Sequence, residues 1–244
     1  DSFCSAPMLT ISPELQERMQ KYAYDVVEAI GVIGGTNVQF AHDPKTGRIV
    51  IIEINPRTSR SSALASKATG FPIAYVSALL AAGLTLDEIP YWRDGTLDKY
   101  TPSGDYVVIK FARWAFEKFP GAIDKLGTQM RAVGEVMSIG KNYKEALQKA
   151  IRSLEIGRYG LGFAKNFNEK TLDELMAMLS EPTSERQFIL YEALRKGADV
   201  DALYALTYIK PYFLSQMREL VLLEEEIIKH RGGELPDALL ISAK

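Results

Sequence analysis

Three polar side chains at alternate positions could hold a metal ion and a phosphate group together. Glu53, Asn55 and Arg57 are separated by Ile54 and Pro56. Successive side chains of a strand point to opposite faces, so these three would share one face. Mg²⁺ prefers oxygen ligands such as carboxylates and phosphates, and the planar fork of arginine matches phosphate oxygens. The spacing therefore permits metal–phosphate chemistry, but a solvated sheet face is the commoner explanation of an isolated Glu-x-Asn-x-Arg motif.

The chain offers a partner strand for this polar face. Residues 36–42 and 49–55 are both strand-like, and they flank the sequence Asp-Pro-Lys-Thr-Gly, which is typical of a turn. A turn centred on Thr46 would pair the two strands as an antiparallel hairpin with Gln39 opposite Glu53. This register is an assumption that the turn composition supports.

The assumed register sorts the side chains of the hairpin into two faces. Asn37 would lie opposite Asn55, on the face that carries Gln39 and Glu53, with Arg57 just beyond. The other face would be core-like and would carry Val38, Phe40, Ile52 and Ile54. Amide oxygens can add ligands to a metal site without adding negative charge, so the opposed amides strengthen the metal–phosphate interpretation. Asn37 is the weaker candidate because mainly the shared face supports it.

The composition limits the classes of function that the chain can serve. The 244 residues are 47% hydrophobic and 25% charged, and the net charge of −2 argues against broad electrostatic binding to nucleic acid or a membrane. Cys4 is the only cysteine, so we expect no intrachain disulfide, no cysteine metal cluster and a cytoplasmic location. No apolar run approaches the roughly 18 residues of a membrane span. Because the chain begins at Asp1 rather than methionine, we expect a piece of a longer protein.

The order of predicted elements changes along the chain. Ser12 and Pro13 form a helix start and Gly31 is a suitable C-terminal cap, so a helix is expected over residues 13–30. Strand patterns then alternate with helices, and an amphipathic helix ends near Gly157. Beyond that point only helices are expected, at residues 171–180, 184–197, 200–207 and 210–231.

A glycine-rich connector marks the predicted domain boundary. Gly157, Gly160 and Gly162 lie within a short segment between the part with predicted strands and helices and the part with predicted helices only. We therefore predict an α+β fold in which residues 1–157 form an antiparallel sheet with helices and residues 158–244 form an all-α helical domain.

Long stretches of the sequence resemble one known family. The segment NVQFAHDPKTGRIVIIEINPRTSRSSALASKATGFPIA is similar to the large subunit of the carbamoyl phosphate synthetases. The segments DYVVIKFARWAFEKFPGA, LGTQMRAVGEVMSIGKNYKEALQKAIRSLEIG and FLSQMRELVLLEEEI resemble the same family in the same order. The Glu-x-Asn-Pro-Arg core indicates an ATP-grasp enzyme in general. The following TSRSSALASKATGFPIA is similar to the first of the subunit's two ATP-grasp halves, which makes carboxyphosphate.

The resemblance implies roles for five residues. Gln39 and Glu53 resemble positions that bind one divalent ion and contact ATP, and Glu53 and Asn55 resemble the pair that binds a second ion. Arg57 and Arg60 resemble the residues near the transferred phosphate and bicarbonate. The implied cofactors are ATP, as a substrate, and two Mg²⁺ or Mn²⁺ ions.

The implied activity belongs to a longer parent protein. That parent would be an ATP-dependent carbon–nitrogen ligase, a glutamine-hydrolysing carbamoyl phosphate synthase, which phosphorylates bicarbonate and serves arginine and pyrimidine synthesis. The implied partners are a glutaminase small subunit and the remainder of the large subunit. Residues 158–244 resemble the oligomerisation domain, shortened at its end, so a homo-oligomer is expected. Neither nucleic acid nor a membrane is an expected partner.

Two alternatives stay open. The first is another ATP-grasp ligase, such as a biotin carboxylase relative. The predicted helical segment 158–244 argues against this alternative. The second is a non-catalytic assembly module, which we favour for the chain alone. The resemblance begins inside an ATP-grasp domain, so the chain would hold only half of a nucleotide cleft and should be inactive by itself.

Overall fold

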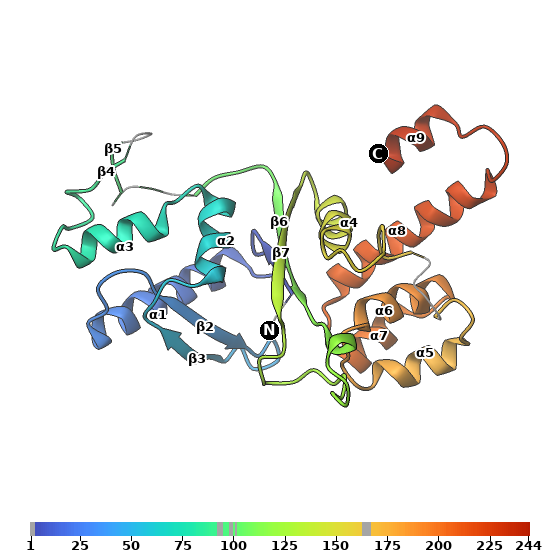
Figure 1. Ribbon diagram of the computed structural model, residues 1–244, viewed down its shortest axis with the longest axis horizontal. Coiled ribbons are helices and arrows are strands. Elements are labelled where there is room, and N and C mark those ends of the chain that lie inside the picture. Colours follow the sequence, from blue (N-terminus) through green and yellow to red (C-terminus); the bar gives the residue numbers. More distant parts are fainter. Residues whose placement is uncertain (1–2, 92–94, 98–99, 101, 163–166) are drawn as a thin grey trace. The chain divides into compact units, whose positions relative to one another are not determined.

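The chain forms two compact units. A computed structural model describes all residues except 1–2, 92–94, 98–99, 101 and 163–166. Unit 2 comprises Ile11–Asp105, and unit 1 comprises Asp1–Thr10 together with Tyr106–Lys244 (Figure 1). The domain boundary predicted near Gly157 stays a prediction, and part of the predicted connector lies outside the described residues.

Unit 2 combines helices with two small antiparallel sheets. Its elements in chain order are α1 (Pro13–Ile30), β2 (Asn37–His42), β3 (Ile49–Asn55), α2 (Arg60–Thr69), α3 (Ile73–Ala81), β4 (Pro90–Tyr91) and β5 (Gly95–Thr96). Strand β2 pairs with β3, and β4 pairs with β5. The fully buried apolar cluster described in this unit is small and consists of Val76, Ile89 and Leu97.

Local signals define α1 as the sequence predicts. The Ser12 hydroxyl accepts a hydrogen bond from Leu15 N at 3.3 Å, and Pro13 occupies the first turn. Gly31 ends the helix with a φ of +70°, a left-handed conformation that favours glycine. The predicted helix over residues 13–30 is therefore confirmed with both of its caps.

The turn between β2 and β3 is built around Asp43. Its carboxylate accepts hydrogen bonds from Thr46 Oγ1 at 2.7 Å and from Lys45 N at 2.9 Å, and these bonds lower the pKa of Asp43. Gly47 has a φ of +70°, and its N–H donates to the Asp43 carbonyl at 2.8 Å. A side chain and a glycine thus fix the closed end of the hairpin.

Unit 1 begins with a three-stranded antiparallel sheet that a helix covers. The strand order is β1 (Cys4–Ala6), β6 (Val107–Arg113) and β7 (Gly134–Gly140). Helix α4 (Tyr143–Ser153) packs against β6 and β7, and its Leu147 and Ile151 are fully buried. The short N-terminal strand β1 completes this sheet across about a hundred residues of sequence, which no local pattern predicts.

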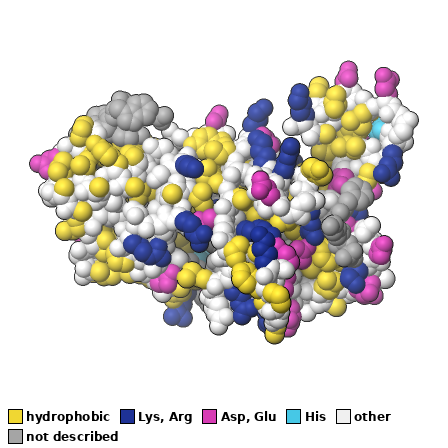
Figure 2. Space-filling model, in the orientation of Figure 1, with side chains coloured by type: hydrophobic (Ala, Val, Ile, Leu, Met, Phe, Trp, Pro, Cys, Tyr) yellow, Lys and Arg dark blue, Asp and Glu magenta, His cyan; other side chains and the backbone are white. Residues whose placement is uncertain are grey.

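The rest of unit 1 is helical. The helices are α5 (Leu172–Leu179), α6 (Arg186–Arg195), α7 (Val200–Thr207), α8 (Pro211–Lys229) and α9 (Asp237–Ala243). The first four confirm the helical segments predicted from the sequence, and the α+β fold class is confirmed with them. Helix α9 was not predicted and contains no buried residue. Its Leu240 and Ile241 are 52% and 75% exposed, and Figure 2 shows hydrophobic side chains over this end of the chain.

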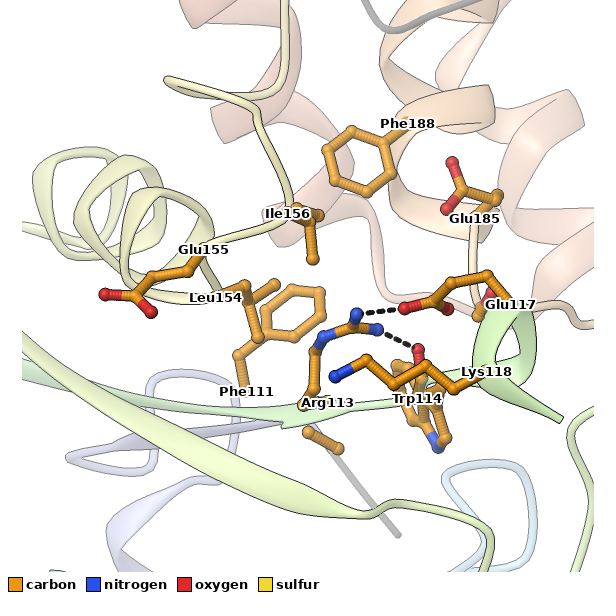
Figure 3. A pocket seen from close by; sticks show the side chains of 12 residues that line it. Phe111, Arg113, Trp114, Glu117, Lys118, Leu154, Glu155, Ile156, Glu185 and Phe188 are labelled. Carbon is orange, nitrogen blue, oxygen red and sulfur yellow. Dashed lines mark hydrogen bonds and ion pairs between the residues drawn. The ribbon is translucent and has the colours of Figure 1, made fainter.

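A pocket of about 460 Å³ opens within unit 1, beside the end of β6 (Figure 3). Its walls come from β6, from the 3₁₀ helix η2 (Phe116–Lys118), from the segment after α4 and from the start of α6.

Among the described residues, no single helix has both the length and the apolar character that crossing a membrane requires. Helices α2 and α3 reach that length and composition only when they are taken together, as a pair bent by 114°.

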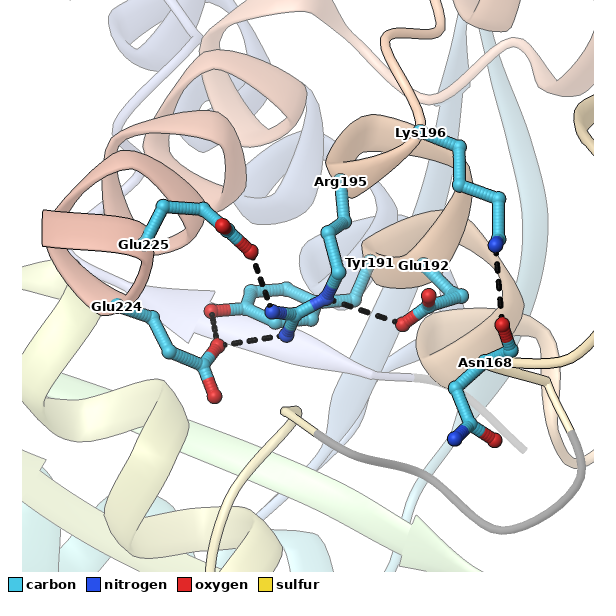
Figure 4. A network of polar contacts seen from close by, with 7 residues as sticks. All are labelled: Asn168, Tyr191, Glu192, Arg195, Lys196, Glu224 and Glu225. Atoms are coloured by element: carbon cyan, nitrogen blue, oxygen red, sulfur yellow. Dashed lines mark hydrogen bonds and ion pairs between the residues drawn. The ribbon is translucent and has the colours of Figure 1, made fainter. Parts of the chain in front are cut away.

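Arg195 joins α6 to α8 through a cluster of carboxylates (Figure 4). Its guanidinium lies 2.8 Å from Glu224 and 2.8 Å from Glu225, and its Nε donates to Glu192 at 3.1 Å. The Glu192 side chain is only 3% exposed, and the Tyr191 hydroxyl donates to Glu224 at 2.8 Å. Burial opposes the charged form of Arg195, but Glu224 and the other carboxylates raise its pKa overall. The guanidinium is thus the shared counter-charge of a partly buried acidic group.

Replacing Arg195 should destabilise the helical region strongly. Arg195→Met keeps much of the side-chain volume but leaves Glu192 buried without its cation, so the free energy of unfolding should fall by about 3 kcal/mol. Urea denaturation followed by circular dichroism measures this loss. Arg152→Met, at an exposed arginine of α4 with no described side-chain partner, is the matched control and should cost less than about 0.5 kcal/mol. Equal effects of the two variants would contradict the role given to Arg195.

Candidate functional site

The hairpin pairs its polar residues in the predicted register. Gln39 lies opposite Glu53, and Asn37 lies opposite Asn55, in the antiparallel ladder of β2 and β3. Gln39 and Glu53 are exposed, and the two asparagines are half-buried. The prediction that an acid and three amides share one face is therefore confirmed.

The opposite face of the hairpin differs from the prediction at one residue. The register shifts after Gln39, so that Phe40 pairs with Ile51 and Ile52 becomes the extra residue of a β-bulge. Ile52 is 62% exposed, and its predicted place on a core-like face is wrong. Val38, Phe40 and Ile54 are half-buried, as that face requires.

Hydrogen bonds hold Glu53 and Asn55 next to each other. Asn55 Nδ2 donates to Glu53 Oε1 at 3.0 Å, although one residue separates them along the strand. The backbone carbonyl of Asn55 accepts from Thr36 Oγ1 at 3.1 Å and from Arg57 N at 2.8 Å. The end of β3 is therefore fixed from both sides, which limits the positions that the acid and the amide can take.

The two arginines follow directly from this end of β3. Arg57 lies two residues beyond Asn55, and Arg60 is the first residue of α2. Ser59 and Ser62 form the capping box of α2, with Ser62 N donating to Ser59 Oγ at 3.3 Å and Ser59 N donating to Ser62 Oγ at 3.1 Å. Both serines are thus the cap residues of α2. The side chains of Arg57 and Arg60 are exposed and have no partner among the described residues, which leaves both cations available to an anion.

The oxygen donors of this face fit a divalent ion that shares its coordination with phosphate. Glu53 supplies one carboxylate, and Gln39 and Asn55 supply amide oxygens, which is the hard donor set of Mg²⁺ or Mn²⁺. No group of three or more His, Cys, Asp or Glu residues in the described part of the chain could hold a metal alone. The remaining ligands would have to come from phosphate oxygens or water. Coordination by Asn55 would require its amide to turn from Glu53 and present Oδ1.

Gly35 and Thr36 come directly before β2 and hold this end of the hairpin in place. Neither residue was predicted from the sequence. A Cβ atom on Gly35 would lie 2.6 Å from Ser77 Oγ and 3.0 Å from Thr58 Cγ2, so this glycine permits the backbone before β2 to lie close to both α3 and Thr58. Thr36 adds its bond to the end of β3. The Gly-Gly-Thr sequence before the strand is the signal that could have identified them, because glycine beside a strand often marks a close backbone approach.

Comparison with known proteins assigns most of the chain to two domain models. Residues 1–89 match the model "Carbamoyl-phosphate synthase L chain, ATP binding domain", and residues 135–244 match "Carbamoyl-phosphate synthetase large chain, oligomerisation domain". The carbamoyl phosphate synthase large chain of Archaeoglobus fulgidus is 48% identical over 100% of this chain, and that of Thermotoga neapolitana is 52% identical over 93%. The chain belongs to the carbamoyl phosphate synthase large-chain family.

The chain covers only part of those relatives. It spans 23% of the Archaeoglobus fulgidus large chain and 20% of the Thermotoga neapolitana large chain. It also matches 41% of a Methanopyrus kandleri protein named "Carbamoyl phosphate synthase large chain, N-terminal section", at 45% identity over 95% of this chain. The chain therefore corresponds to part of the ATP-binding domain and to the oligomerisation domain of a carbamoyl phosphate synthase large chain.

Solved biotin carboxylases resemble the chain much more weakly. The enzyme from Campylobacter jejuni is 13% identical, with a TM-score of 0.44 over 83% of this chain and 46% of that protein. A likeness of that size is too weak to assign the chain to the biotin carboxylases.

Substituting Gly35 should disturb the end of the hairpin. Gly35→Ala places a methyl group against Ser77 and Thr58, and overpacking of this kind costs about 1–3 kcal/mol in the free energy of unfolding. Hydrogen exchange of the β2 and β3 amides should accelerate accordingly. Gly127→Ala is the control, since a Cβ there meets nothing within 4 Å, and its exchange should match that of the unmodified chain. Unchanged exchange in Gly35→Ala would show that the close approach does not support the hairpin.

Proposed function

We propose that the hairpin face of Gln39, Glu53 and Asn55 forms the metal and ATP-phosphate wall of an ATP-dependent carbon–nitrogen ligase. The reaction would be the phosphorylation of bicarbonate to carboxyphosphate within a longer, glutamine-hydrolysing carbamoyl phosphate synthase. The observation that carries this proposal is the pairing of Gln39 with Glu53, with Asn55 hydrogen-bonded to the same carboxylate at 3.0 Å. Family membership supports the choice of substrates.

Each residue of the face has a role that follows from its chemistry. Glu53 would bridge two divalent ions through its two carboxylate oxygens, while the amide oxygens of Gln39 and Asn55 would each add one ligand. The ions, when bound, neutralise charge on the triphosphate. Because Glu53 contributes the only negative charge among these three residues, the wall would not repel the phosphates strongly.

Arg57 and Arg60 would bind the phosphoryl group that is transferred. In the proposed reaction a bicarbonate oxygen attacks the γ-phosphorus of ATP, a new O–P bond forms, and the bond between the γ-phosphorus and the ADP oxygen breaks. Arg57 and Arg60 carry guanidinium groups that can hold equatorial phosphoryl oxygens and the bicarbonate anion. Their exposure and lack of a described counter-ion support this role.

The relatives support a place in the first half of the synthase. A Methanopyrus kandleri protein named as the N-terminal section of the large chain matches 95% of this chain. We infer that the parent protein works in the cytoplasm with a glutaminase small subunit, which supplies ammonia, and with the remainder of the large subunit. The carboxyphosphate would then react with ammonia on the route to carbamoyl phosphate for arginine and pyrimidine synthesis.

A second function, assembly, has its own supporting observation. The oligomerisation-domain match covers residues 135–244, and helices α8 and α9 expose Leu222, Leu240 and Ile241 by 60%, 52% and 75%. A contiguous apolar patch often marks a contact between protein chains, and Figure 2 shows hydrophobic side chains gathered over this end of the chain. For the chain by itself we propose this non-catalytic assembly role, with homo-oligomers formed through the helical region.

Glu53→Gln in the full-length large chain should abolish bicarbonate-dependent ATP hydrolysis, with a loss of at least about a hundredfold. The change removes the bridging carboxylate and keeps the side-chain size. Glu17→Gln, at an exposed carboxylate of α1, is the matched control and should leave the rate unchanged.

The chain of 244 residues alone should show no such hydrolysis. Near-normal activity of full-length Glu53→Gln would overturn the proposed metal role. Turnover by the isolated chain that Glu53→Gln abolishes would overturn only its proposed inactivity.

A further inference from the structure

One carbonyl oxygen joins the two segments that meet at the open end of the hairpin. The Asn55 carbonyl, at the last residue of β3, accepts from Thr36 Oγ1 at 3.1 Å and from Arg57 N at 2.8 Å. Thr36 precedes β2 and Arg57 follows β3, so a residue from before the hairpin and a residue from after it share this acceptor. Thr36 is half-buried, and its bond to the carbonyl is therefore partly shielded from water.

The bond from Arg57 N closes a three-residue turn with Pro56 at its centre. Proline restricts its own φ to about −65°, which is close to the value of about −75° at the centre of an inverse γ-turn. Pro56 therefore suits this turn. Because the turn is so short, the direction of the backbone at Arg57 depends on where the Asn55 carbonyl lies. The Thr36 hydroxyl holds that carbonyl through a contact that spans 19 residues of sequence.

Gly35 supports the chain on the other side of Arg57. A Cβ atom on Gly35 would lie 3.0 Å from Thr58 Cγ2, so the backbone of Gly35 lies directly against Thr58. Gly35 and Thr36 together thus contact the residue that follows Arg57 and the carbonyl two residues before it. The Arg57 side chain is exposed and has no partner among the described residues, so its backbone determines where the guanidinium can reach.

We propose that Thr36 is a positioning residue for Arg57. Its hydroxyl holds the Asn55 carbonyl and, through the turn at Pro56, places the guanidinium where it meets the transferred phosphoryl group. This inference rests on the proposed function, because it takes the role of Arg57 from there. A single hydrogen bond to a carbonyl contributes modestly to stability, whereas a displacement of about 1 Å in a catalytic group can lower a rate about a hundredfold. A positioning role therefore affects the rate more than the folding.

Removal of the Thr36 hydroxyl tests this role in the full-length large chain. Thr36→Val keeps the branched shape of the side chain and leaves the Asn55 carbonyl with Arg57 N as a donor. It should lower kcat for bicarbonate-dependent ATP hydrolysis at least about tenfold and change the KM for ATP less than about twofold. Thr36→Ser keeps the hydroxyl and should retain at least about half of the rate.

Thr58→Val is the matched control for these kinetics. Thr58 is exposed and adjacent to Arg57, and its hydroxyl has no hydrogen bond within the described part of the chain. Its kcat should stay within about twofold of the unmodified enzyme. An unchanged kcat in Thr36→Val would overturn the inference. A rise in the KM for ATP as large as the fall in kcat would also overturn it, because that pattern indicates a general loss of the hairpin face.

Hydrogen exchange of the Arg57 amide tests the contact without turnover. In the 244-residue chain, Thr36→Val should accelerate this exchange and Thr36→Ser should not. The Gly47 amide, which donates to the Asp43 carbonyl at the closed end of the hairpin, is the internal reference and should keep its rate in both variants. Equal exchange of the Arg57 amide in Thr36→Val and the unmodified chain would show that the hydroxyl does not hold the turn.

Arg57→Gln separates this inference from the function on which it rests. In the full-length large chain this substitution should lower bicarbonate-dependent ATP hydrolysis at least about a hundredfold. A near-normal rate in Arg57→Gln would overturn the proposed role of Arg57 itself. A large loss in Arg57→Gln beside a normal rate in Thr36→Val would leave that role intact and overturn only the positioning role of Thr36.

Discussion

The antiparallel pairing of Gln39 with Glu53 is the constraint on which the proposed site depends. Because side chains alternate along a strand, a shift of one residue at this point would turn the carboxylate to the other face. The hydrogen bond from Asn55 to Glu53 then brings a second oxygen-bearing side chain beside the same carboxylate. The proposed metal–phosphate chemistry at this face therefore depends first on the register of the two strands and second on the residue types.

Several separate contacts maintain that register. The Asp43 turn closes one end of the hairpin, and the bond from Thr36 to Asn55 fixes the other. The bulge at Ile52 lies between these two ends and moves the extra residue outward without moving Glu53. The hairpin thus accommodates a β-bulge in its middle because its two ends are fixed independently. The proposed site lies at the end near Asn55.

The elements that neighbouring residues determine were predicted from the sequence, whereas the contacts between distant segments were not. The Ser12 cap, the Asp43 turn and the polar alternation around Glu53 each act within a few residues, so the helix, the turn and the register followed from them. The bulge at Ile52 depends on one inserted position that composition does not reveal. The pairing of β1 with β6, the pocket near Lys118 and the network around Arg195 join segments far apart in the chain. The family resemblance supplied ligand roles that the hairpin geometry alone could not give.

Paramagnetic broadening by Mn²⁺ tests the central claim most directly. In a nuclear magnetic resonance titration of the labelled chain, the side-chain amides of Gln39 and Asn55 should broaden first, and Glu53→Gln should remove that effect. This result would place a divalent ion on the hairpin face without requiring turnover. Broadening that begins elsewhere in the chain, or that persists unchanged in Glu53→Gln, would contradict the account.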